Sequence, residues 1–475
     1  MHCNILIFLI KIFARVYLSS NSTVRITFNI INFRQHSNPD HSCTYVIIHT
    51  SDTKYKGYGI AATLGKGNEL VVQTCELMFR LAENRTTTEI YSNFAAFWRE
   101  LTTDVELRWL GPECGVVHLA TAAIVNALWD LWARIEDKPV WKLLADMKPE
   151  QLVSTIDFRY IRDVVTEEEA IEMLRESQAR KEAKETELQR SGYPAYTADI
   201  GWWSFRDQQV RSACAKFRKL EFKHFKMSVG RTIAESQKRC RVVRSVIGNK
   251  HNMLLDANEF WDMHDVMYSM IGFEPTRPSC IEDPTSLDDV VGYPEILAAL
   301  KKIKHPMQVS CGEMCANRVQ FKQFLKIGGI DFWNVNVGRL GGVNEALAVY
   351  LMAKKHNLPV WGHAGGIGLG EMIQHLQMWD FICLSQSTNM IEYTSQQHGY
   401  FEDPVFVRNA AYLLPNRPGF STQLKDKCIA RWSYPEGIRW KRLFSNRLKR
   451  KKNASETNLI MKQVEIDDNT KILCR

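Results

Sequence analysis

Short apolar runs recur along the second half of the chain and alternate with longer amphipathic segments. They lie about 25–30 residues apart, which is the length of one β-strand, one helix and their connections, so the pattern predicts repeated βα units and a parallel barrel. The predicted strands are Lys223–Val229, Met253–Leu255, Cys280–Ile281, Gln308–Val309, Phe332–Val337 and Pro359–Trp361.

The first third of the chain has a different rhythm. Residues 43–65 are rich in β-branched side chains and glycine, as strands and turns are, and Leu119–Leu144 carries apolar residues at helical spacing. We therefore predict a small α+β domain over residues 22–150 and a barrel over 151–395. The segment 396–445 is expected to return to the α+β domain.

The composition is that of a globular protein, with 475 residues, 45% of them hydrophobic and 24% charged. No run of about 18 uninterrupted apolar residues occurs, so we expect no contact with a membrane. The net charge of +8 is matched by eight basic residues in the stretch Arg439–Lys452, which has no acidic residue. Such a distribution is typical of a neutral body with a basic tail, predicted over 446–475, and argues against a nucleic-acid-binding surface.

The chain begins with an acid-poor segment, because no acidic residue precedes Asp40. Residues 1–21 fit a mitochondrial presequence or a disordered N-terminus, which leaves mitochondrion and cytoplasm as the two candidate locations. The twelve cysteines show no metal-type CxxC pair and indicate a reducing compartment. Whether the chain forms homo-oligomers is left open.

Three acidic residues end three successive predicted strands. Asp256, Glu282 and Glu313 lie 26 and 31 residues apart in turn, which is one βα unit each. Strand ends meet at one mouth of a parallel barrel, and three clustered carboxylates are costly unless a cation neutralises them. Their hard oxygen atoms favour Mg²⁺ over Zn²⁺. His363 follows the predicted strand Pro359–Trp361, and its role is either structural or that of a catalytic acid or base.

The chain resembles the L-fuconate dehydratases of the enolase superfamily over about 400 residues, excluding the first forty and the basic tail. The motifs that carry the resemblance lie in both predicted domains. They are Leu64–Gly67, Arg108–Glu113, Val117–Ala123, Asn126–Trp132, Gly192–Thr197, Leu254–Asn258, Cys280–Ser286, Gly312–Glu313, Asn317–Val319, Arg339–Glu345 and His363–Leu369.

This resemblance implies an α/β fold with a (β/α)7β TIM-like barrel and an N-terminal α+β capping domain. It also implies one Mg²⁺ on the three carboxylates and a small sugar acid as substrate, bound by Lys226, Asn258 and Glu392. The expected reaction is removal of the proton next to the substrate carboxylate, followed by loss of the β-hydroxyl group as water. L-Fuconate would give 2-keto-3-deoxy-L-fuconate.

The chain departs from the family at three places. Ser228 stands where the family has its catalytic lysine, two residues after Lys226 and on the same strand face. Asn336 replaces the Asp that orients His363, and Ile31–Arg34 replaces a substrate loop. A serine without a neighbouring base cannot take a proton from carbon, so two hypotheses remain. One is a working dehydratase in which His363 and Lys226 share the proton transfers, and the other is a metal-binding pseudoenzyme that binds a ligand or partner.

Overall fold

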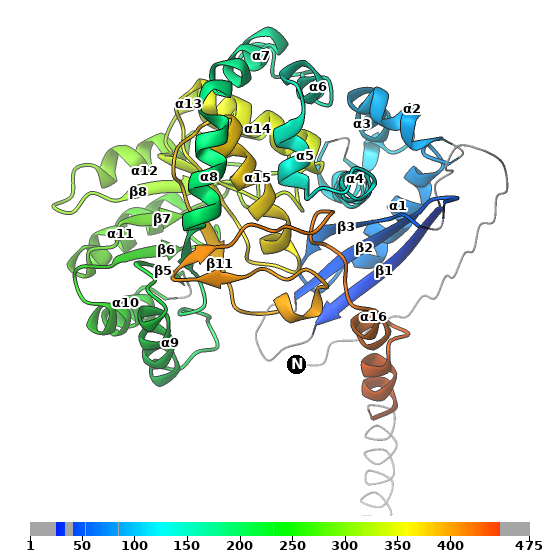
Figure 1. Cartoon of the computed structure of the whole chain (residues 1–475). Helices are drawn as coiled ribbons and strands as arrows, with labels where there is room; N and C mark the ends of the chain where they lie inside the picture. Colours follow the sequence, from blue (N-terminus) through cyan, green and yellow to red (C-terminus); the bar gives the residue numbers. More distant parts are fainter. Residues whose placement is uncertain are drawn as a thin grey trace, which may run out of the picture.

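The computed structural model describes residues 25–33, 41–52, 54–83, 85–111, 113–230 and 232–446 (Figure 1). The expectations for residues 1–21, for Arg34 and for the tail beyond residue 446 fall outside this part of the chain.

The centre of the molecule is a closed barrel of eight parallel strands, in which the last strand pairs with the first. The strands are β4 (Tyr193–Thr197), β5 (His224–Ser228), β6 (Asn252–Asp256), β7 (Cys280–Glu282), β8 (Gln308–Cys311), β9 (Phe332–Val335), β10 (Val360–Gly362) and β11 (Ile391–Tyr393). A helix follows each strand except the last, namely α9 (Asp207–Lys219), α10 (Ile233–Ile247), α11 (Met263–Phe273), α12 (Gly292–Leu300), α13 (Arg318–Ile327), α14 (Val343–Lys355) and α15 (Leu369–Cys383). The prediction of a (β/α)7β barrel is therefore confirmed.

The register of the barrel strands brings the predicted site residues to one level. Ser228 pairs with Asp256, and Asp256 pairs with Glu282 on the next strand. Glu282 in turn pairs with Ser310 of β8, three residues before Glu313. Because these are the C-terminal ends of the strands, their side chains gather at the barrel mouth that carries the active site in this type of fold.

An antiparallel sheet beside the barrel forms the core of the capping domain (Figure 1). Its strands, in spatial order, are β14 (Ser433–Tyr434), β1 (Arg25–Phe33), β2 (His41–His49) and β3 (Lys56–Thr63). Helices α1 (Asn68–Phe79), α2 (Thr87–Ser92), α3 (Phe94–Thr103) and α4 (Gly115–Ile135) accompany it. Since β14 pairs with β1, the C-terminal segment reaches the sheet that the N-terminal segment begins.

Helix α4 is the one described helix that is long and apolar enough to cross a membrane. However, 89% of its apolar window is buried inside the protein, where it packs on β3. Its apolar composition is therefore that of a core helix.

The remaining elements complete the two domains. They are η1 (Arg108–Leu110), α5 (Val140–Asp146), α6 (Pro149–Val153), α7 (Glu167–Glu176), η2 (Gln178–Arg180), α8 (Lys181–Ser191), η3 (Glu274–Thr276), η4 (His398–Tyr400), β12 (Val407–Arg408), β13 (Ala411–Tyr412) and α16 (Asp426–Trp432). Among them, α16 packs against β1 of the capping sheet. Helices α7 and α8 are mostly solvated and have only three buried residues between them: Ala170, Leu174 and Leu188.

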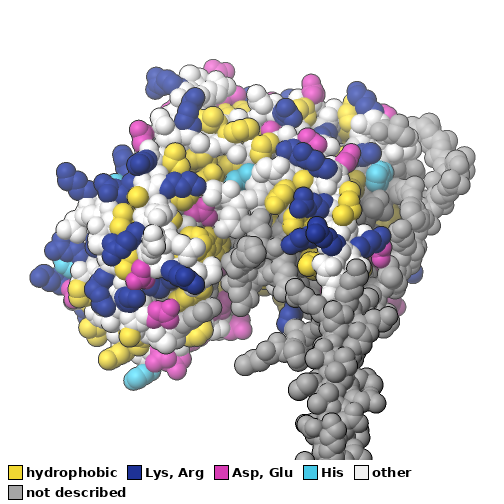
Figure 2. All heavy atoms as spheres, turned by 90° about the horizontal axis from the view of Figure 1, so that it is seen from below, with side chains coloured by type: hydrophobic (Ala, Val, Ile, Leu, Met, Phe, Trp, Pro, Cys, Tyr) yellow, Lys and Arg dark blue, Asp and Glu magenta, His cyan; other side chains and the backbone are white. Residues whose placement is uncertain are grey.

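The body of the protein has a net charge near zero, but its charged side chains are unevenly distributed over the surface. Figure 2 shows many Lys and Arg side chains over the face seen from below, interspersed with acidic and hydrophobic side chains. Exposed basic residues of α9 and the turn after it include Arg211, Lys216, Lys219 and Lys223. Lys216, Arg218 and Lys219 lie in the last turn of α9, where basic residues complement the helix dipole.

Candidate active site at the barrel mouth

Lys226 lies at the centre of a buried group of carboxylates. It is 4% exposed. Its Nζ atom lies 3.2 Å from Asp256 Oδ2, 3.0 Å from Glu282 Oε2 and 3.0 Å from Glu392 Oε1. These three carboxylates come from β6, β7 and β11, so one ammonium group joins strands on opposite sides of the barrel.

His363, which directly follows β10, lies against a second part of the same group. Its Nδ1 atom is 2.7 Å from Glu313 Oε2 and 2.9 Å from Glu392 Oε2. Glu392 Oε2 also accepts a hydrogen bond from the backbone N–H of Ala364. Glu392 therefore contacts both cationic side chains, with one carboxylate oxygen turned to each.

Asn258 lies where the chain turns away from β6. Its side-chain amide donates to Glu313 Oε1 over 3.4 Å, and its backbone N–H donates to Asp256 Oδ1. Asn258 adopts a positive φ of 45°, a conformation that asparagine tolerates better than most residues. The turn thus connects two of the predicted metal ligands.

Burial and like charge shift the pKa values of the site carboxyls in different directions. Burial raises the pKa of Glu282 well above its usual value, and the charges of Asp256 and Glu313 add to the shift although Lys226 opposes it. For Asp256, burial outweighs Lys226 and raises the pKa to about 6. Burial would also raise the pKa of Glu313, but the charge of His363 prevails and lowers it to about 2. The raised pKa values of Asp256 and Glu282 mean that additional positive charge nearby would favour their ionised forms.

The two cationic groups hold their protons firmly. Burial opposes the charge of Lys226, but Glu282, Glu392 and Asp256 outweigh it and raise the pKa well above the usual lysine value. In the same way, Glu313 and Glu392 overcome burial and raise the pKa of His363 to about 10. At neutral pH both groups are proton donors in this arrangement.

Two of the three places at which the chain departs from the family motifs, Ser228 and Asn336, also lie at this mouth. Ser228 is half-buried at the end of β5, two residues after Lys226. Asn336 follows β9, and its Oδ1 atom accepts the backbone N–H of Gly338. His363, in contrast, directs Nδ1 to Glu313 and Glu392.

Asp283 was not identified from the sequence. It directly follows Glu282 and is fully buried. Within the described part of the chain, neither of its carboxylate oxygens has a hydrogen-bond partner. Burial raises its pKa well above the usual value, with Glu313 and Glu282 contributing. The motif Glu282-Asp283 could have drawn attention to it, but paired acids at strand ends are common.

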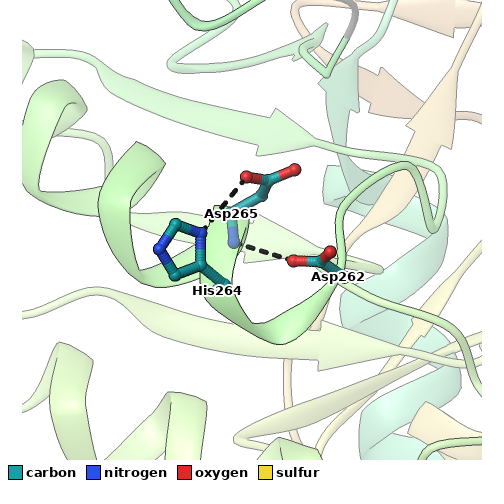
Figure 3. Close-up of side chains that lie close together, drawn as sticks. All are labelled: Asp262, His264 and Asp265. Atoms are coloured by element: carbon teal, nitrogen blue, oxygen red, sulfur yellow. Dashed lines mark hydrogen bonds and ion pairs between the residues drawn. The ribbon is translucent and has the colours of Figure 1, made fainter.

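A second cluster with metal-ligand side chains lies at the start of α11 (Figure 3). Asp262 caps this helix by accepting the backbone N–H of Asp265, and His264 Nδ1 lies 3.6 Å from Asp265 Oδ1. All three side chains are exposed. Helix capping and first-turn charge explain the two acids, so this cluster is a surface feature.

Comparison with known proteins gives several close relatives. Residues 209–428 match the family model described as enolase C-terminal domain-like. Bovine mitochondrial enolase superfamily member 1 is 46% identical over 413 residues, which cover 86% of this chain and 93% of the relative. L-Galactonate dehydratase from Hypocrea jecorina is 39% identical over 84% of this chain and 90% of its own length.

Solved structures agree in fold. The crystal structure of human mitochondrial enolase superfamily member 1 superposes with a TM-score of 0.87 at 42% identity, covering 89% of this chain and 98% of the human one. L-Talarate dehydratase from a Polaromonas species, solved with Mg and L-glucarate, gives a TM-score of 0.65 at 18% identity, covering 87% of this chain and 97% of its own.

The barrel, its capping domain and the identity shared over most of both chains lead to one conclusion. This chain belongs to the enolase superfamily, in the group of mitochondrial enolase superfamily member 1, and its relatives include sugar-acid dehydratases.

Proposed function

We propose that this chain is a Mg²⁺-dependent dehydratase of a sugar acid such as L-fuconate, weakened by the loss of its catalytic lysine. The observation that carries the proposal is the buried set of carboxylates around Lys226 and His363 at the barrel mouth. The relative that is an L-galactonate dehydratase supports the substrate class. The bovine relative is named a mitochondrial protein, which supports a mitochondrial location for this chain.

The donor set fits Mg²⁺. Asp256, Glu282 and Glu313 would hold the ion, and Glu282 Oε1 is buried without a hydrogen-bond partner among the described residues. The raised pKa values of Asp256 and Glu282 indicate that the cluster lacks positive charge. A bound Mg²⁺ would supply that charge and stabilise the negative charge that develops on the substrate carboxylate as the neighbouring proton leaves.

The protein's own groups would divide the remaining work unequally. His363, with its pKa raised to about 10, is suited to donate a proton to the departing β-hydroxyl group. Lys226 and Asn258 would orient the substrate. Removal of the proton from carbon is the weak step, because Ser228 has no basic group and the ammonium of Lys226 is retained by three carboxylates.

The direct test is turnover of a panel of sugar acids, including L-fuconate and L-galactonate, with and without Mg²⁺. We expect slow, Mg²⁺-dependent formation of a 2-keto-3-deoxy acid and exchange of the proton next to the carboxylate in deuterated water. His363→Asn should abolish the turnover. Absence of both turnover and exchange for every acid would favour the alternative, a metal-binding pseudoenzyme. Two observations support this alternative: Ser228 offers no base, and the side-chain oxygen of Asn336 accepts the backbone N–H of Gly338.

Metal binding is tested separately from turnover. Mg²⁺ should raise the melting temperature of the parent, because neutralising clustered carboxylates favours the folded state. Asp256→Asn should reduce this response. An equal response in both proteins would contradict the assignment of Asp256 as a ligand.

A further inference from the structure

Four consecutive barrel helices, α9 to α12, lie side by side along one side of the molecule (Figure 1). They belong to two segments of opposite charge. From the start of α9 to the end of α10, residues 207–247, the sequence has eleven Lys or Arg and three Asp or Glu. From the start of β6 to the end of α12, residues 252–300, it has one Lys or Arg and ten Asp or Glu. The near-zero net charge of the body is thus a sum over neighbouring segments of opposite sign.

The exposed charges on these helices have few partners of opposite charge within the protein. On α9, α10 and the turn after α9, the exposed bases include Arg211, Lys216, Lys219, Lys223, Lys238 and Arg241. Within the described part of the chain, only Lys238 of this set forms an ion pair, with Asp207. On and beside α11 and α12, the exposed acids are Asp262, Asp265, Asp288 and Glu295. None of these acids is paired with a lysine or arginine among the described residues.

Exposed apolar side chains lie on the acidic half. Tyr268 and Ile271 are one turn apart on the outer face of α11, with exposed fractions of 65% and 62%. Val291, just before α12, is 66% exposed. The helix dipole explains acids at the start of α11 and α12, but it explains neither these apolar side chains nor the exposed Arg241 in the middle of α10. Exposed apolar side chains bordered by charged ones are typical of a surface that another protein covers.

We propose that the outer faces of α9, α10, α11 and α12 bind a second copy of this chain in a two-fold symmetric dimer. A two-fold axis near the boundary between α10 and α11 places the basic half of each copy against the acidic half of the other, so each charge contact is made twice. Tyr268 and Ile271 of α11 then lie close to the axis, where an interface excludes water best.

The charges favour a second copy over other partners. One surface carries both signs in adjoining halves, so it is complementary to itself. A nucleic acid or another polyanion would be attracted by the basic half and repelled by the acidic half.

Sedimentation velocity of the full chain over a range of protein and salt concentrations measures the association. We expect a monomer–dimer equilibrium whose Kd rises with salt, because salt screens charges at the rim of an interface. Ile271→Asp should raise the Kd about 30-fold or more, since it places an unpaired charge near the axis. Ile438→Asp is the matched control, because Ile438 is 69% exposed and lies outside this surface. It should leave the Kd unchanged, and circular dichroism checks that both variants are folded.

Charge reversal tests the pairing of the two halves. Lys216→Glu with Arg241→Glu makes the basic half acidic, and Asp288→Lys with Glu295→Lys makes the acidic half basic. Each double variant alone should be monomeric where the parent is a dimer, because like charges then face one another. An equimolar mixture of the two double variants should form a heterodimer, since opposite charges meet again at both contacts.

Hydrogen exchange of the parent tests the location without any substitution. Amides of α9 to α12 should exchange more slowly at high than at low protein concentration. A parent that stays monomeric, equal Kd values for Ile271→Asp and Ile438→Asp, or double variants that do not associate when mixed would overturn the proposal. The outcome is independent of the dehydratase proposal, because none of the substituted residues belongs to the buried set at the barrel mouth.

Discussion

Lys226 and Ser228 lie on the same face of β5 but in different chemical surroundings. Lys226 is enclosed by three carboxylates, and these hold its pKa well above the usual value against the effect of burial. Ser228 is half-buried and ends the strand. A general base needs a pKa near the working pH, which neither side chain offers. Under the proposed function, the missing chemical group is a base at position 228.

Ser228→Lys should restore activity toward a sugar acid that the parent turns over slowly. A positioned base contributes about 10²–10⁴-fold to the rate, and we expect kcat/KM to rise within that range. The matched control is Ser228→Met, which adds similar length without an amine and should give no increase. A parent that is already as fast as the Lys variant would show that the base lies elsewhere.

Some residues of the site are placed by a repeating pattern in the sequence, and others by contacts between distant segments; only the first kind could be predicted. Asp256, Glu282 and Glu313 could be predicted because strand ends in a barrel are periodic along the chain. The contact of Glu392 with both Lys226 and His363 could not, because it depends on side chains that reach across the barrel from distant segments. The sequence also could not show that the carboxylate of Asp283 is buried without a hydrogen-bond partner among the described residues, because this depends on tertiary packing.

At the scale of elements, β3 and α4 make an unusually close contact. A Cβ atom on Gly59 would lie 2.0 Å from the carbonyl oxygen of Ala123 and 2.4 Å from the backbone nitrogen of Ala127. The obstructing atoms belong to the backbone of a buried helix and cannot turn away. Glycine at position 59 thus sets the distance between the capping sheet and its central helix.

Gly59→Ala should destabilise the protein by roughly 2 kcal/mol or more, since overpacking a tight core costs about 1–3 kcal/mol. Urea unfolding followed by tryptophan fluorescence measures the change. Gly399→Ala is the control, because a Cβ atom there meets nothing within 4 Å. Equal stability of the two variants would contradict the account of the β3–α4 contact.

The elements themselves were predictable where hydrophobic periodicity was strong. All six strands inferred from apolar runs are present, and no end is shifted by more than two residues. The first and last barrel strands, β4 and β11, were not inferred; β4 is interrupted by Pro194. Their pairing with each other closes the barrel, which is a property of the tertiary structure and leaves no local pattern.

At the scale of the whole molecule, His375 of α15 connects segments far apart in the chain. Its Nδ1 atom accepts the backbone N–H of Trp141, and its Nε2 atom lies 3.1 Å from Ser421 Oγ. Burial lowers its pKa to about 3. An unfolded chain would bind a proton at this histidine below about pH 6.5, whereas the folded one would not.

The parent should therefore lose stability as the pH falls from about 6.5 toward 3. Between pH 7.5 and 5 this histidine contributes a loss of about 2 kcal/mol. His375→Gln should reduce the pH dependence of the unfolding free energy by that amount, whatever its effect at pH 7.5. The exposed His264→Gln should leave the dependence unchanged. A parental slope that survives in His375→Gln would show that other groups cause it.

Arg318 joins the barrel to the capping domain through buried charge. It is 1% exposed at the start of α13. Its Nη1 atom lies 3.0 Å from Glu345 Oε1 of α14 and 3.1 Å from Glu113 Oε2, just before α4. The other oxygen of Glu345 lies against His118 of α4. One guanidinium thus neutralises acids from both domains.

Removing one partner of such a buried set leaves charge without compensation, at a cost of about 3–5 kcal/mol. We expect Arg318→Met to lower the unfolding free energy by that amount in urea. Arg175→Met breaks the exposed pair with Glu150 and should cost less than about 1 kcal/mol. Adding Glu345→Gln to Arg318→Met should recover part of the loss, because it removes a carboxylate that has lost its partner. If Arg318→Met and Arg175→Met cost the same, the domains are joined by apolar packing and not by this network.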